Sequence, residues 1–364
     1  MTPDRTPAWA AWSPQAVLVS QLQPDGSITE TAVPAQVHPD WRYLVRLEHL
    51  DTGMLLLRTG DSRGTRLHAV SDDPGVAPLV PLPAAVAEFP PSRVLPFPDG
   101  TVAGIDPQRS RLLLSAGGRA DARSFPPDLL VADLTRDAEG RWWICGGEEQ
   151  ARPSEFATWR AWAASEDDGR TWRRDGPTGG GLLGAWHSVW SGAAAAYRRI
   201  FVVNRFLVLA AETEAIDDQS TLIDVRDPRG RWHQIKLRHD VLRTVLPGDG
   251  DEVLLFSHHG MMVGVSSRAQ WRRDLGPQLL QALRRQTGRP PDDLRVELLD
   301  ARAGVAGTLL LVSLRIPRAG GLARFGEAIA TMTAEGIHLL MRYDDPDRPE
   351  PVTVCWGTSE TVCF

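Results

Sequence analysis

Two adjacent histidines, His258 and His259, are the residues of this sequence best suited to metal or proton chemistry. The stretch DEVLLFSHHG (251–260) is strand-like up to the histidines and ends in glycine, which places the pair at the tip of a hairpin. Neighbouring residues of a strand point to opposite faces and cannot share a metal, whereas in a turn they can. No third ligand stands at a metal-motif spacing, since His233 and His239 fit no template. We therefore expect no metal here and keep both histidines as candidate binding residues.

A second candidate site is the segment GAWHSVWSG (184–192), which holds Trp186, His187 and Trp190 between glycines. The two tryptophans are four residues apart and so lie on one face of either a helix or a strand. Exposed aromatic side chains on a loop typically anchor a protein interface. Buried ones would instead pack between neighbouring sheets. We take Trp186, His187 and Trp190 as candidate binding residues, with packing as the alternative.

Several chemical motifs are missing from the chain. It has no Gly-x-Ser-x-Gly nucleophile elbow, no Walker loop and no dinucleotide fingerprint. The GGG at 179–181 is not followed by the Lys-Ser/Thr pair that a phosphate loop needs. No cofactor is therefore expected.

The sequence around these residues predicts short strands joined by tight turns. The clearest turn is SEDDGRTW (165–172), where aspartate oxygens can accept backbone N–H groups and a glycine tolerates positive φ. It follows the strand-like runs GRWWICGG (140–147) and WRAWAAS (159–165). The stretch therefore predicts the tip of a β-hairpin.

This turn resembles the Asp-box of sialidase-type β-propellers, the bacterial neuraminidase repeat, whose pattern is Ser-x-Asp-x-Gly-x-Thr-Trp. Ser165, Asp167, Gly169, Thr171 and Trp172 match it at every defined position. In that family the box is a structural turn at the blade periphery, away from the catalytic centre. The resemblance thus implies a propeller, and a structural role for the box.

The resemblance also raises sialidase chemistry, in which an arginine triad binds the substrate carboxylate and a tyrosine acts as nucleophile. LRIP (314–317) contains the Arg-Ile-Pro of the family's first arginine motif, so Arg315 is the catalytic candidate. However, Leu314 replaces an aromatic residue, and the segment follows the Asp-box instead of preceding it. The three tyrosines have no recognisable glutamate partner and are expected to be structural: Tyr43, Tyr197 and Tyr343.

Weaker versions of the same turn recur along the chain. They begin near residues 20, 71, 115, 165, 224, 266 and 331, at intervals that average about one propeller blade. Residues 277–287, PQLLQALRRQT, are apolar at helical spacing, begin with proline and end before Gly288. The sequence predicts an all-β protein, a single propeller of seven blades with this one short helix inserted. A six-bladed ring is the alternative.

A propeller must also join its first and last blades. PVTVCWGTS (351–359) is a strand candidate that could complete the sheet begun by AVLVSQL (16–22). We therefore expect residues 1–364 to form one domain whose ring is closed by this C-terminal strand.

The composition excludes several function classes. A net charge of −6 gives no general reason to bind nucleic acid or an anionic membrane surface. No apolar run has the length of a membrane span, and the first residues lack the pattern of an export signal. The cysteines, Cys145, Cys355 and Cys363, are too few for a disulfide framework and are expected to be buried thiols. A cytoplasmic protein is expected, without nucleic-acid or membrane partners.

Two function classes remain. The first is a non-catalytic propeller that binds another protein, as an assembly factor or a toxin-immunity type of partner would. The second is a carbohydrate-active or other pathway-specific enzyme, hydrolase or lyase, with its site at the central channel and a small glycan as ligand. The sequence favours the binding module, because the Asp-box carries structure and the catalytic signature is absent.

Overall fold

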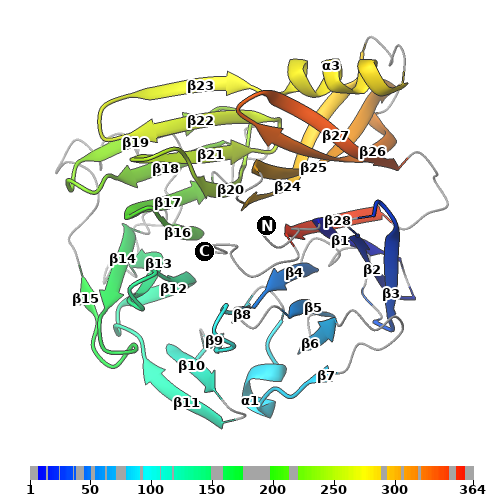
Figure 1. The fold of residues 1–364 in the computed structure, drawn as a ribbon. Helices are drawn as coiled ribbons and strands as arrows, with labels where there is room; N and C mark the ends of the chain where they lie inside the picture. Colours follow the sequence, from blue (N-terminus) through cyan, green and yellow to red (C-terminus); the bar gives the residue numbers. More distant parts are fainter. Residues whose placement is uncertain are drawn as a thin grey trace.

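The strands form seven four-stranded antiparallel sheets arranged around one central axis (Figure 1). The chain is therefore a seven-bladed β-propeller, and the prediction of fold and blade number is confirmed. This computed structural model describes residues 7–13, 15–23, 25–35, 37, 45–50, 54–61, 64–70, 79–90, 93–106, 108–116, 119–148, 159–174, 197–212, 220–287, 293–304, 307–318, 321–343 and 350–356.

Each blade runs from an innermost strand at the axis to an outermost strand at the rim (Figure 1). In this inner-to-outer order the first three blades are β28 (Glu350–Trp356), β1 (Pro7–Trp12), β2 (Val17–Leu22) and β3 (Ile28–Val33); β4 (Arg46–His49), β5 (Leu55–Asp61), β6 (Gly64–Val70) and β7 (Leu79–Val80); and β8 (Val94–Pro96), β9 (Val102–Asp106), β10 (Arg111–Ala116) and β11 (Arg119–Ser124).

The fourth and fifth blades are β12 (Leu129–Arg136), β13 (Trp142–Glu148), β14 (Trp159–Ser165) and β15 (Arg173–Arg174); and β16 (Arg199–Val203), β17 (Phe206–Glu212), β18 (Thr221–Arg226) and β19 (Trp232–Leu237). The sixth and seventh are β20 (Leu242–Pro247), β21 (Glu252–Ser257), β22 (Met261–Ser266) and β23 (Gln270–Asp274); and β24 (Arg295–Gly304), β25 (Gly307–Arg318), β26 (Gly321–Thr333) and β27 (Gly336–Tyr343).

The turns that the sequence analysis picked out share one place in the repeat. The turn at 165–172 joins β14 to β15, the third and fourth strands of its blade, and the candidates near 20, 224, 266 and 331 precede the same connection in theirs. The candidate at 71–78 lies outside the described residues, as does the turn itself after residue 116. The turn residues in the sequence therefore indicated the length of the repeat and also which two strands of each blade the turn connects.

The first blade is built from both ends of the chain. Its innermost strand, β28, pairs antiparallel with β1, from Pro7 opposite Trp356 to Trp12 opposite Glu350. Val354 and Cys355 of β28 are fully buried, which an unpaired tail would not allow. The wider expectation, that residues 1–364 make one domain, stays a prediction.

An apolar cluster fills each interface between neighbouring blades, because strand side chains alternate between the two faces of a sheet. Trp142 and Trp143 illustrate this alternation. Trp142 packs toward the third blade with Leu112, whereas Trp143 packs toward the fifth blade with Ile200. Adjacent tryptophans thus serve two interfaces, and in this pair packing explains both side chains.

Two helices are described, the single turn α1 (Ala84–Ala87) and α3 (Gly276–Thr287). The helix expected at 277–287 is confirmed as α3. Leu279, Ala282 and Leu283 follow helical spacing and bury one face against the sixth and seventh blades. No helix in the described part of the chain is both long and apolar enough to cross a bilayer.

Candidate functional site

Arginines gather where the innermost strands meet. Arg46 lies on β4, Arg199 on β16 and Arg243 on β20, while Arg58 of β5 stands directly opposite Arg46 in the second blade. Like charges in directly opposite positions of two strands repel each other. We call Arg46, Arg58, Arg199 and Arg243 the central arginine cluster.

Arg58 is the most buried member, with only 7% of its surface exposed. Its Nη1 donates to the backbone carbonyl of Val94 on β8, whereas its Nε has no hydrogen-bond partner among the residues that the structure describes. Burial lowers the pKa of the guanidinium to about 10, and the positive charge of Arg46 pushes it the same way, although Glu48 opposes both. Desolvation of a charge without an ion-pair partner is unfavourable.

Arg199 and Arg243 are half-buried and bind neutral acceptors. Nη1 of Arg199 donates to the carbonyl of Leu242 at 2.8 Å, and Nε of Arg243 donates to Nδ1 of His258 at 3.3 Å. Burial lowers the pKa of both guanidinium groups, and the charge of Arg46 lowers it further in each case. The charge of Arg46 thus acts on the other three members, while nearby acids act on them with the opposite sign: Glu48, Asp133, Glu212, Asp240 and Glu297.

Arg58, Arg199 and Arg243 share one deficiency. Among the described residues, none of them forms an ion pair with a carboxylate; their hydrogen bonds go to two carbonyls and a histidine. Guanidinium groups that are withdrawn from water usually pair with acids. These three guanidinium groups make no charge-assisted hydrogen bond to a carboxylate in the described part of the chain.

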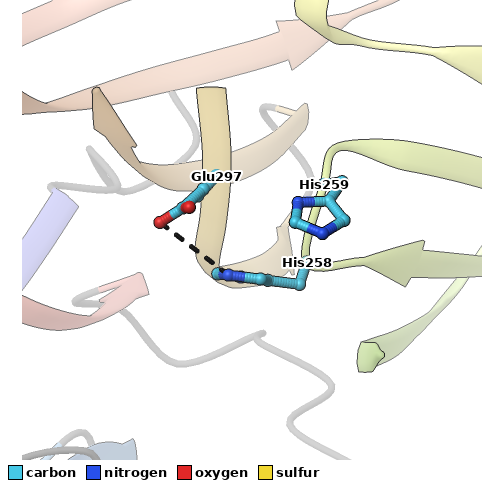
Figure 2. Close-up of side chains that lie close together, drawn as sticks. All are labelled: His258, His259 and Glu297. Atoms are coloured by element: carbon cyan, nitrogen blue, oxygen red, sulfur yellow. Dashed lines mark ion pairs between the residues drawn. The ribbon is translucent and has the colours of Figure 1, made fainter. Parts of the chain in front are cut away.

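His258 and His259 occupy the turn between β21 and β22, beside Glu297 of β24 (Figure 2). Nε2 of His258 lies 3.8 Å from Oε2 of Glu297, and Nε of Arg315 lies 3.4 Å from the same oxygen. Burial lowers the pKa of His258, with a further contribution from the charge of Arg243, so the ring is neutral at pH 7. Glu297 thus joins two of the predicted site residues, His258 and Arg315.

The two histidines and Glu297 place their ligand atoms within 4.8 Å of one another, close enough to share a metal ion. The neighbouring guanidinium argues against this use. Nδ1 of His258 lies 3.3 Å from Nε of Arg243 and 3.2 Å from the carbonyl oxygen of Leu298, so this nitrogen already has two protein partners. The positive charges of Arg243 and Arg315 would repel a metal ion at this place.

Asp133 of β12 is the carboxyl group near the cluster with the most perturbed pKa, which burial raises to about 6. Its Oδ2 accepts the N–H of Ile200 from the next blade at 3.0 Å, and its Oδ1 accepts the N–H of Leu134 at 2.9 Å. Asp300 repeats this in the seventh blade, where Oδ2 accepts the N–H of Val354 at 3.3 Å. Both aspartates follow a register shift in their strand. The repetition identifies a structural bridge between neighbouring blades.

The tyrosines do not complete a sialidase-like site in the described residues. Tyr197 is fully buried, and its hydroxyl donates to Oδ2 of Asp224 at 2.6 Å between the fourth and fifth blades. Tyr343 ends β27, an outermost strand, and Tyr43 lies outside the described residues. No described tyrosine therefore stands with the central arginine cluster as a nucleophile.

The five residues that match the Asp-box pattern form a closed hydrogen-bonded turn. Ser165 donates to Oδ1 of Asp167 at 2.7 Å and accepts the N–H of Gly169 at 2.9 Å. The N–H and hydroxyl of Thr171 both donate to Asp167, at 2.8 and 2.7 Å. These bonds, led by those from Thr171, lower the pKa of Asp167 to about 2. The glycine adopts a φ of 75°, which the turn requires.

Trp172 ties this turn to the third blade, because its Nε1 donates to the carbonyl of Ser124 at 2.9 Å. Trp186, His187 and Trp190 lie outside the described residues, and their binding role stays a prediction. No motif in the sequence marks the arginine cluster. The only local signal is that the apolar runs WRYLVRL (41–47) and GMLLLRTG (53–60) contain arginines, two in the first run and one in the second.

Comparison with known proteins identifies relatives of the fold but none of the sequence. No protein-family model and no curated protein matches the chain. A Bacteroides uniformis protein that carries the name 6-phosphogluconolactonase has a TM-score of 0.50 at 12% identity, covering 97% of this chain and 99% of its own. YCF48 bound to a D1 peptide (TM-score 0.42, 11% identity, 93% of this chain and 92% of that one) and YCF48 from Cyanidioschyzon merolae (TM-score 0.41, 9% identity, 88% and 95%) also match. At these identities the likeness concerns the fold alone.

Proposed function

We propose that this protein is a non-catalytic binding propeller whose central arginine cluster receives a carboxylate-bearing segment of a partner protein. The observation that carries the proposal is the set of three guanidinium groups, Arg58, Arg199 and Arg243, that have no carboxylate partner among the described residues. The repulsion and desolvation of these groups disfavour the folded protein by itself. A bound acid would offset both effects.

Carboxylates suit this site because of how arginine donates. A guanidinium presents planar, forked N–H groups that match a carboxylate, and such charge-assisted bonds are each worth about 1.5–3 kcal/mol. Acidic side chains follow one another along a protein segment, so one segment can reach several arginines. A peptide segment with several carboxylates is therefore the simplest ligand that could bind several of these arginines at once.

Titration calorimetry with two short peptides tests the proposal. An end-blocked triglutamate peptide should bind the wild-type protein, while end-blocked triglutamine should not. Arg243→Gln should weaken triglutamate binding about tenfold or more, the effect of one lost charged hydrogen bond. Arg119→Gln is the matched control, because Arg119 is an exposed arginine on β11, an outermost strand. Equal affinity for the two peptides, or an equal loss in both variants, would reject the proposal.

The enzymatic alternative would place a small anionic glycan at the same arginines. Its support is Arg315, which approaches His258 through Glu297. Incubation with an activated sialoside separates the two functions, and we expect no turnover. Hydrolysis that disappears in Arg315→Ala would favour the enzyme and overturn the choice of a binding module.

Three narrower assignments belong to the same proposal. We propose that 165–172 is an Asp-box and that the chain is a sialidase-type propeller by descent, which the closed turn around Asp167 supports. The segment with Trp186 and Trp190, together with α3, extends the surface for the partner. The cytoplasm is the proposed compartment, in keeping with Cys145 and Cys355, which are buried free thiols.

A further inference from the structure

A cavity of about 480 Å³ lies between the fifth and sixth blades, and most of its lining comes from their outer strands. Cavities of this size typically accommodate small organic ligands or single side chains of a partner with their surroundings. The lining comes from β19, the turn that follows it, β22 and β23: Lys236, Leu237, Arg238, Asp240, Met261 and Arg272.

The lining has three cations and one carboxylate. Lys236, Arg238 and Arg272 are exposed, and none of them forms an ion pair with an acidic residue in the described part of the chain. Arg272 makes only a 3.4 Å hydrogen bond to the backbone carbonyl of Lys236. The cations therefore approach one cavity without neutralising partners.

Asp240, the single acid of the lining, accepts hydrogen bonds from backbone N–H groups. Only 7% of its surface is exposed, and its Oδ1 accepts the N–H groups of Val241 at 2.9 Å and His259 at 3.0 Å. Two backbone dipoles thus offset part of its negative charge. The cavity keeps an excess of positive charge next to the apolar side chains of Leu237 and Met261.

We propose that this cavity binds a phosphomonoester, a site independent of the one at the centre of the ring. A phosphomonoester carries a charge of about −1.5 to −2 at pH 7 and three strong acceptor oxygens. That charge matches the excess of three cations over one acid better than a single carboxylate does. Lysine and arginine are the side chains that bind phosphate groups. The rest of the ligand, to which the phosphate is attached, would occupy the remaining volume beside Leu237 and Met261.

Lys236 makes the proposal directly testable, because it is the only lysine of the sequence. Its acetylation by an amine-specific reagent can be followed by mass spectrometry as one site. A phosphoserine peptide and glycerol 3-phosphate represent the two sources of a phosphomonoester, a modified partner protein and a free metabolite. The unphosphorylated serine peptide and sodium chloride at equal ionic strength are the controls.

At a ligand concentration ten times Kd we expect acetylation of Lys236 to slow about tenfold, by mass action. Arg272→Gln should weaken this protection about tenfold, whereas Arg284→Gln, at an exposed position of α3, should not change it. Stronger protection by the phosphopeptide indicates a phosphoprotein, and stronger protection by glycerol 3-phosphate indicates a metabolite. No protection, equal protection by the serine peptide, or unchanged protection in Arg272→Gln would overturn the proposal.

Discussion

Burial and the repulsion between like charges are unfavourable for the arginines at the centre of the ring. Arg46 and Arg58 face each other across two strands, and the acceptor of Arg58 is a carbonyl of the next blade. Residues that destabilise a fold and cluster at one site typically bind a ligand there. Their removal should therefore improve stability and weaken binding together.

Arg58→Met should raise the free energy of unfolding by about 1–3 kcal/mol, because an apolar side chain of similar length replaces a desolvated charge. Urea denaturation measures this change, and triglutamate affinity should fall in the same variant. A destabilised Arg58→Met protein would mean that the bond to Val94 links the second and third blades more strongly than the charge repels.

We propose a structural role for the turn at 165–172, whose side chains bind its own backbone. Ser165→Ala should lower the free energy of unfolding by about 1–3 kcal/mol, because the buried N–H of Gly169 loses its acceptor. Glu166→Ala, at a side chain 79% exposed in the same turn, should stay within about 0.5 kcal/mol of wild type. Triglutamate binding should be unchanged in both; a selective loss of binding in Ser165→Ala would contradict the structural role.

Among the strands, β28 contributes to two blades although it lies near the end of the sequence. It is the innermost strand of the first blade, and it also meets the seventh blade, where Thr353 donates to Oδ2 of Asp300 at 2.8 Å. Trp9, Leu311 and Val354 fill the interface between these two blades. One strand thus completes a sheet and an apolar cluster.

Deletion of residues 351–364 should expose the edge of β1 and the apolar cluster beside it, which produces aggregation or loss of cooperative unfolding. Size-exclusion chromatography and thermal denaturation of the truncated protein measure this. Asp300→Ala is the milder companion, and should lower the Tm without opening the ring. A monomeric truncation with wild-type Tm would contradict closure by β28.

The molecule has a net charge of −6, while Arg58, Arg199 and Arg243 form no ion pair with a carboxylate among the described residues. At about 0.1 M salt the Debye length is about 10 Å, so the local arginines outweigh distant acids for a ligand at the axis. Net charge alone would predict repulsion of an acidic peptide. The local cluster predicts attraction.

Triglutamate affinity should therefore fall as sodium chloride rises from about 0.05 to about 0.5 M, because salt screens the attraction. Calorimetry at several salt concentrations gives the slope, and Arg243→Gln should flatten it. An affinity that rises with salt would show that the net charge of the molecule governs binding, and would place the peptide away from the arginines.

The sequence by itself determined the repeat. Turns such as SEDDGRTW and helices such as 277–287 follow from residues that are neighbours in the chain, because hydrogen bonds within a turn and helical periodicity are local. The blade number followed from the spacing of those turns. That Trp142 and Trp143 point to opposite faces follows from strand alternation, whereas their burial between blades is seen only in the structure.

Only the tertiary structure decided the site. Arg46, Arg58, Arg199 and Arg243 come from β4, β5, β16 and β20 of three blades, and no spacing in the chain marks them as a group. They meet because a closed ring brings its innermost strands to one axis (Figure 1). Among the described residues, Arg58, Arg199 and Arg243 form no ion pair with a carboxylate, and this is a property of the folded chain, since charge compensation depends on distances in space and not along the sequence.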